Sequence, residues 1–149
     1  MAHRSVKSFT ATIDRPPDVV FDYLADVSKH GEWSPKPYRV EGSTGPVTTG
    51  DTFTSIGWLP GDKNHRNDVT VTESSPPRRL VLDSLEKGEH FINTFELQPD
   101  GSGTRLTRTF DAPPPSFPLS LAFPLIMAAV IRPDVQKGLR NLKANLERT

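Results

Sequence analysis

The sequence predicts an α+β fold in which a seven-stranded antiparallel sheet wraps around one long C-terminal helix. Short segments alternate apolar and polar residues and are bounded by Gly, Pro, Asp or Asn, as strands are. The connections between these segments are too short for crossover helices, so neighbouring strands must be antiparallel. Apolar residues recur every three or four positions from 118 to 147, which is the spacing of a helix. The length suits a single domain, residues 1–149.

The elements can be placed in order along the chain. Residues 6–13 alternate as a half-buried strand does. Asp14 can cap a helix whose first turn holds Pro16 and Pro17 and which ends near Ser28. Residues 29–37 then form a turn or a second short helix that carries Trp33. Six further strands are expected at 38–44, 51–58, 67–74, 79–85, 90–98 and 104–110.

The C-terminal segment divides into two halves of different character. Pro124 and Pro133 predict a kink or break near Ile131 or Arg132. The half after the break has a clear polar face, whereas the first half is apolar nearly all round. We therefore expect the first half to be covered on more than one side, by a ligand, by a second subunit in a homodimer through 116–131, or by the short helix around Trp33.

Charge and composition exclude several function classes. Lys plus Arg and Asp plus Glu both number 18, so no net field attracts nucleic acid or an anionic membrane. Cysteine is absent, and the N-terminus lacks the apolar core of a signal peptide. The longest apolar stretch, Leu119–Ile131, is shorter than the roughly 18 to 20 residues that span a bilayer. We expect a protein without a transmembrane segment, located in the cytoplasm.

No motif for a metal or cofactor is found. The four histidines, His3, His30, His65 and His90, do not have the spacing of metal ligands. The chain also lacks a nucleophile elbow, a phosphate-binding loop and a dinucleotide-binding glycine motif. We expect neither a metal nor a cofactor.

Strand parity predicts which side chains face the interior. In an antiparallel hairpin the residue numbers of each pair add up to the same total, and the two paired residues face the same side of the sheet. Turns near 75–78, 86–89 and 99–103 place Asn93 opposite Arg108 in an otherwise apolar row. The expected concave face comprises Ile56, Trp58, Val69, Val71, Leu82, Phe91, Asn93, Phe95, Leu106, Arg108 and Phe110.

An arginine in an apolar row must be paired, hydrated or bound to a ligand, because an unpaired buried charge is very costly. One interpretation is structural, with Arg108 either paired to a carboxylate such as Glu73 or Asp83 or reaching the edge of the sheet. The other is functional, with Arg108 and Asn93 orienting an oxygen-bearing apolar ligand in an interior cavity.

Several segments carry a family resemblance. The stretch 13–26, the Trp33-Ser34-Pro35 element, Gly103-Thr104 before the last strand and the terminal helix resemble the START-like (SRPBCC) superfamily. Within it, the chain is similar to the polyketide cyclase/dehydrase and lipid-transport group. The resemblance implies a helix-grip fold with a deep apolar cavity between sheet and terminal helix. It does not select an activity, because the superfamily contains cyclases, carriers and receptors.

Two functions remain. The first is binding of a small hydrophobic molecule, such as a lipid, isoprenoid or polyketide, by a carrier or sensor. The second is a polyketide cyclase or dehydratase, in which Arg108 and Asn93 hold a carbonyl or enolate and His65 or Glu73 moves a proton. We favour binding, since the predicted interior has an anchoring pair but no convincing acid/base pair.

Further ligand contacts are expected outside the sheet. Trp33 either packs behind the first helix or lines the cavity mouth. Phe123, Met127 and Ile131 have core spacing on the terminal helix and can line a cavity as well. The proline-rich lead and proline-broken helix suit a hinge, so 116–131 and 29–37 are predicted to frame the cavity entrance.

Overall fold

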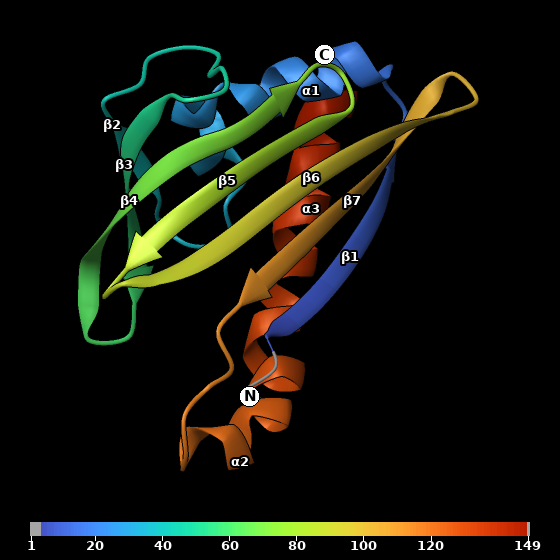
Figure 1. Cartoon of the computed structure of the whole chain (residues 1–149). Helices are drawn as coiled ribbons and strands as arrows, with labels where there is room; N and C mark the ends of the chain where they lie inside the picture. The colour runs from blue at the N-terminus through green and yellow to red at the C-terminus, as the bar shows by residue number, and fades with distance from the viewer. Residues whose placement is uncertain (1–3, 149) are drawn as a thin grey trace.

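The computed structural model describes residues 4–148 and confirms the α+β architecture. Its strands are β1 (Ser5–Ile13), β2 (Arg39–Glu41), β3 (Thr52–Leu59), β4 (Asp62–Ser75), β5 (Arg79–Glu86), β6 (Glu89–Asp100) and β7 (Gly103–Ala112). Its helices are α1 (Pro17–Ala25), η1 (Val27–Glu32), α2 (Leu119–Ile126), η2 (Met127–Ile131) and α3 (Arg132–Glu147). Within residues 4–148 the seven strands form one antiparallel sheet in the order β1-β7-β6-β5-β4-β3-β2, which curves around α3 (Figure 1).

The core lies between the concave face of the sheet and α3. The helix buries Val135, Leu139, Leu142 and Leu146 at the spacing of one helical stripe, while Lys137 and other charged residues remain exposed. Fully burying one such side chain stabilises the folded state by about 1.5–3 kcal/mol relative to leaving it exposed. The sheet contributes a matching set of fully buried side chains to the same cluster: Val71, Leu80, Phe95 and Leu106.

The segment after η1 is fixed to α3 by a close approach. Gly138 lies where a Cβ would be only 3.3 Å from the Pro35 Cδ, so the absence of a side chain lets Trp33-Ser34-Pro35 rest on the helix. Asn141 Nδ2 donates a hydrogen bond of 3.2 Å to the Trp33 carbonyl oxygen. The Trp-Ser-Pro element is therefore held in place at the start of the pocket described below.

The C-terminal helix is distorted where the sequence predicts a break. The five residues of η2 form a π-helical turn immediately before Arg132. Pro133 has no N–H to donate to the preceding turn, which accounts for the departure from α-helical geometry there.

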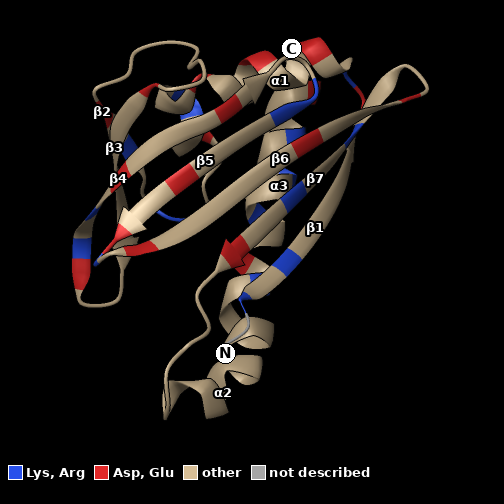
Figure 2. Ribbon diagram, in the orientation of Figure 1, with Lys and Arg blue, Asp and Glu red and all other residues tan. Residues whose placement is uncertain are grey.

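Of the three covers expected over α2 and η2, the short helix around Trp33 is wrong, whereas a ligand and a second subunit stay predictions. Neither element has a buried residue, and α2 projects beyond the sheet (Figure 1). Leu121 and Leu125 are 75% and 72% exposed. Figure 2 shows no charged residue on α2. The segment is thus apolar and mostly uncovered, because it extends past the edge of the sheet face that α3 packs against, and only a few side chains such as Phe123, Met127 and Ile131 are half-buried.

The length of this helix also changes the expectation about membranes. The 13-residue stretch Leu119–Ile131 alone is too short to span a bilayer, but it continues into α3 without a gap. Among residues 4–148, Leu119–Glu147 is the one helix that is long and apolar enough to cross a membrane by length and composition.

The β6–β7 register differs from the sequence-based one by two residues. A two-residue turn, Gly101-Ser102, joins the strands, and Gly101 adopts a φ of +60° that favours glycine. Arg108 therefore lies opposite Phe95, and Asn93 lies opposite Phe110. A shift of two residues preserves the face of each side chain, so both still lie on the concave side.

The β3–β4 hairpin also turns more tightly than expected. Leu59 pairs with Asp62 across a turn in which Gly61 has a φ of +83°. Phe53 consequently lies opposite Val69, and Ile56 lies opposite Arg66. Because successive side chains alternate between faces, the predicted inward orientation of Ile56 is wrong. Trp58 falls at the register shift between Gly57 and Leu59 and is likewise outside the pockets described below.

Candidate functional site

A pocket, called the inner pocket, lies between the sheet and α3. Its volume is about 290 Å³. The concave faces of five strands, the segment after η1 and the first turn of α3 form its walls. Its lining residues are His30, Trp33, Ser34, Pro35, Tyr38, Phe53, Ser55, Asn67, Val69, Leu82, Ser84, Asn93, Arg108, Phe110, Asp134 and Val135.

Arg108 is the cation of the inner pocket. Its Nε donates a hydrogen bond of 3.2 Å to Asn93 Oδ1, a neutral amide from the neighbouring strand. Its guanidinium carbon lies 4.5 Å from the ring centroid of Phe110 and 5.1 Å from those of Trp33 and Phe95. Aromatic rings attract a cation through their quadrupole but carry no net charge. Burial lowers the pKa of Arg108 to about 10, while Tyr38 acts in the opposite direction, so the group stays charged at neutral pH.

His30 is buried in the wall of the pocket in its neutral form. Burial lowers the pKa of its imidazole to about 4, and the charge of Arg108 acts in the same direction. Its Nε2 lies 2.7 Å from the Leu24 carbonyl oxygen, which can only accept, so Nε2 carries the proton. His30 therefore serves as a fixed hydrogen-bond donor to the backbone rather than as a base at neutral pH.

Tyr38 supplies a hydroxyl group to the same pocket. Burial raises its pKa above the ordinary value, and its side chain is hydrogen-bonded to Ser55. The ring stacks on His30 with centroids 6.2 Å apart. The hydroxyl is thus a neutral donor and acceptor near Arg108.

Two polar atoms of the lining have no hydrogen-bond partner among the described residues. They are the buried Trp33 Nε1, a donor, and the buried Asn67 Oδ1, an acceptor. Buried polar groups are nearly always hydrogen-bonded to protein or to a bound molecule. These two atoms leave one unused donor and one unused acceptor in the wall of the inner pocket.

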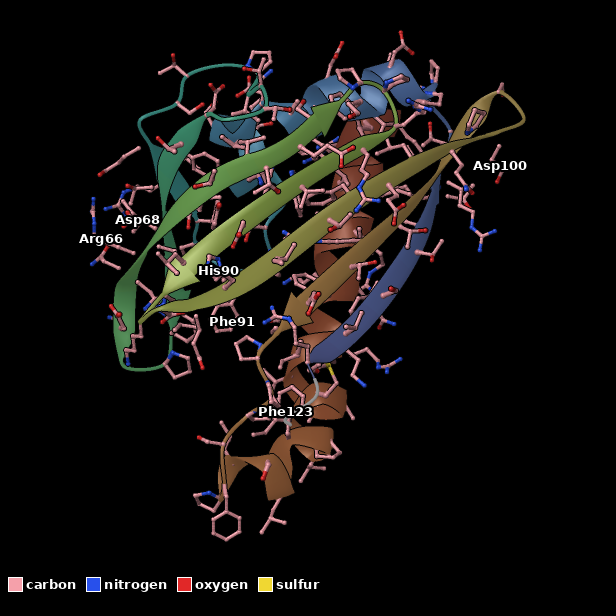
Figure 3. All side chains as sticks on the ribbon, viewed as in Figure 1. Arg66, Asp68, His90, Phe91, Asp100 and Phe123 are labelled. Carbon is pink, nitrogen blue, oxygen red and sulfur yellow. The ribbon has the colours of Figure 1, made fainter. Side chains whose placement is uncertain are left out.

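A second pocket, called the outer pocket, adjoins the first. Its volume is about 510 Å³, and Phe110 lines both pockets. Phe91 on β6 and Phe123 on α2 lie toward the same end of the molecule (Figure 3). The lining residues are Ser5, Lys7, Phe9, Glu89, Phe91, Phe110, Ala112, Pro113, Pro114, Pro115, Ser116, Leu119, Phe123, Met127 and Ile131.

The structure distributes the predicted ligand contacts among three locations. Trp33, Val69, Leu82, Asn93, Arg108 and Phe110 line the inner pocket. Phe91, Phe123, Met127 and Ile131 join Phe110 around the outer pocket. Val71, Phe95 and Leu106 are fully buried in the core, and Ile56 and Trp58 line neither pocket.

The candidate proton carriers lie away from both pockets. The His65 Nδ1 lies 3.0 Å from Asp62, and its Nε2 lies 2.7 Å from Glu86, at the end of the β3–β4 hairpin. Glu73 contacts Arg79 at 3.3 Å. Within residues 4–148 no group of three His, Asp or Glu side chains is arranged to hold a metal ion.

Sequence reasoning missed His30, Tyr38 and Asn67 as lining residues. The sequence Leu59-Pro60-Gly61-Asp62 could have identified Asn67. A two-residue turn at Pro60-Gly61 fixes the register of β3 and β4, and in that register the Asn67 side chain faces the inner pocket. His30 lies in the short helix η1 and Tyr38 in the irregular chain before β2, and neither segment is long enough for periodicity to show which way a side chain faces.

The comparisons with known proteins agree with this fold. A Rhodobacter sphaeroides protein has a TM-score of 0.73 at 18% identity, covering 97% of this chain and 93% of its own. Protein NE0264 from Nitrosomonas europaea has a TM-score of 0.73 at 19% identity, covering 96% and 94%. DynU16, a protein of the dynemicin biosynthetic locus, has a TM-score of 0.64 at 18% identity, covering 95% of this chain and 47% of its own.

These similarities establish the fold alone, and no curated protein sequence matches the chain. A family assignment comes from the sequence itself, which matches the family described as polyketide cyclase / dehydrase and lipid transport over residues 6–147. Since the match covers nearly the whole chain, the protein belongs to the polyketide cyclase/dehydrase and lipid transport family.

Proposed function

We propose that the protein binds a small hydrophobic ligand between the sheet and α3, as a carrier or sensor. The observation that carries this proposal is that two neighbouring pockets share Phe110 as a lining residue. The inner pocket combines aromatic walls with a few polar groups, which is the usual composition of a site for a small molecule. The outer pocket is lined mainly by apolar residues.

The sizes of the pockets narrow the ligand class. The inner pocket is at the lower limit of the roughly 300–1,000 Å³ that is typical of ligand sites. A compact ring system or the head of a lipid fits this volume, and the outer pocket offers room for a longer apolar part. A lipid, an isoprenoid and a polyketide-like molecule all meet this description. We further propose that the protein acts in the cytoplasm.

A cyclase or dehydratase activity has one supporting observation, the placement of Arg108 beside Asn93 in the pocket. Such a pair could hold a carbonyl or enolate oxygen. The reaction also needs a group that moves a proton near neutral pH. His65 and Glu73 lie outside the pocket, and burial holds His30 neutral, so binding is the better-supported function.

Native mass spectrometry of the protein purified from its own host tests binding directly. We expect a retained apolar molecule that adds mass to the folded chain. Ser84→Trp fills the inner pocket and should reduce the ligand-bound fraction, whereas Leu85→Trp, on the opposite face of β5, should not. Absence of any adduct, together with failure of hydrophobic probes to bind, would contradict the proposal.

A further inference from the structure

The charge of Arg108 has no ion-pair partner in the part of the chain that the structure describes. Arg108 forms no ion pair with any of residues 4–148. The carboxylates expected as structural partners are engaged elsewhere, because Glu73 contacts Arg79 and Asp83 contacts His90 at 2.9 Å. The interpretation of Arg108 as half of a structural ion pair is therefore wrong.

The one carboxylate in the lining of the inner pocket is also occupied. Asp134, in the first turn of α3, lies 3.7 Å from the Lys36 ammonium group. It forms no ion pair with Arg108, and Lys36 balances its charge. The lining therefore holds one anion that is paired with Lys36, outside the lining, and one cation, Arg108, that has no ion-pair partner among residues 4–148.

The neighbours of Arg108 cannot neutralise this charge. Asn93 offers one amide oxygen, and the rings of Trp33, Phe95 and Phe110 offer only their electron-rich faces. An uncompensated charge among such groups is costly unless it is hydrated or paired with a bound group of opposite sign. The guanidinium also retains donors beyond the Nε–H that is bonded to Asn93.

From this imbalance we infer that the ligand is an organic anion whose negatively charged oxygen group pairs with Arg108 in the inner pocket. The inference rests on the proposed binding function and specifies its ligand class. Carboxylates, sulfonates and phenolates share the required chemistry, because each presents anionic oxygens to a fork of N–H donors.

The two pockets also give the ligand an orientation. The anionic end lies at Arg108, and the apolar body continues past Phe110 towards Phe123 and Met127 in the outer pocket. The unpartnered Trp33 Nε1 lies in the same wall and is a donor, which suits a site that receives an acceptor-rich head group.

Two dyes with the same ring skeleton provide the test. 1-Anilinonaphthalene-8-sulfonate carries a sulfonate, whereas N-phenyl-1-naphthylamine lacks it, and both become fluorescent in apolar sites. Fluorescence titration of the wild-type protein should give an affinity for the sulfonate dye that is roughly tenfold to a hundredfold higher than the affinity for the neutral dye. This range corresponds to the free energy of hydrogen bonds to a charged group. Arg108→Leu should abolish this preference and leave binding of the neutral dye nearly unchanged, while Arg108→Lys should retain part of it.

Arg105→Leu is the matched control, because it removes the same charge from the opposite face of β7. It should leave the preference unchanged. If Arg108→Leu does not fold, Arg108→Gln provides the same comparison with a side chain that can still bond Asn93. Equal affinities for the two dyes in the wild type, or a preference that survives in Arg108→Leu, would overturn the anion inference. In that case binding of the neutral dye still supports the proposed function, whereas binding of neither dye contradicts both.

Discussion

The two halves of the C-terminal helical stretch differ in how they are held. α3 buries a stripe of apolar side chains against the sheet, whereas α2 and η2 bury none of theirs. The inner pocket is built against α3, and the outer pocket is built against α2 and η2. The difference indicates that the charged anchor is fixed by a packed core, while the apolar wall can adapt to what it covers.

The sequence accounts for this difference. α3 alternates buried leucines with Lys, Arg and Asn, so one face packs and the other is solvated. Residues 117–131 contain no charged side chain, and their apolar residues point in several directions around the helix axis. One sheet face cannot cover such a segment, which leaves it available as a movable wall.

The largest expected effect is on stability, and it separates the two halves. Leu142→Ala removes a fully buried side chain and should lower the free energy of unfolding by about 2–5 kcal/mol. Leu125→Ala, on exposed α2, should change it by less than about 0.5 kcal/mol. Chemical denaturation of both variants measures the difference. A large loss of stability in Leu125→Ala would mean that α2 is packed in solution.

The next effect is the pH dependence of stability that arises from His30, which reports how well the inner pocket excludes water. The folded protein holds His30 neutral with a pKa of about 4, below the ordinary 6.5 of an unfolded chain. The unfolded state therefore binds more protons between these values, and the free energy of unfolding should fall by about 3 kcal/mol as the pH drops from 7 to 4.

His30→Gln serves as the control for this effect. Glutamine retains a donor for the Leu24 carbonyl but does not titrate. The stability of wild type relative to His30→Gln, measured by denaturation from pH 7 to pH 4, should fall with decreasing pH. Parallel pH profiles would show that the imidazole is hydrated and the pocket is open to water.

How much of the structure could be predicted from the sequence also differs between the packed core and the exposed segments. Element order, the break near Ile131 and the facing of Asn93 and Arg108 could be predicted because periodicity and prolines report them locally. The facing of Ile56 could not, because one turn residue more or less inverts the parity of a strand. The exposure of α2 also escaped prediction, since composition shows that a segment needs cover but does not show where the sheet ends.

A smaller effect tests the movable wall. A hydrophobic ligand that fills the outer pocket should raise the hydrogen-exchange protection of residues 117–131, by at most about 2.7 kcal/mol at a hundredfold excess over the dissociation constant. Residues 139–146, in the packed half of the helix, should not respond. N-phenyl-1-naphthylamine is a suitable probe.

Two results would remove the distinction between the halves. The first is that residues 117–131 are as protected as 139–146 without ligand, which would indicate a static core. The second is that their protection vanishes on dilution, which would mean that a second subunit rather than a ligand covers the segment.

The central claim, that the pocket between sheet and α3 holds the ligand, is tested most directly by the two tryptophan indole N–H signals in a ¹H–¹⁵N spectrum. Trp33 lines the inner pocket, whereas Trp58 lines neither pocket, and Trp58→Phe assigns the signals. Titration with 1-anilinonaphthalene-8-sulfonate should shift the Trp33 signal to saturation and leave the Trp58 signal in place. A stationary Trp33 signal while the dye fluoresces on the protein would contradict the account, because the ligand would then be bound outside the inner pocket.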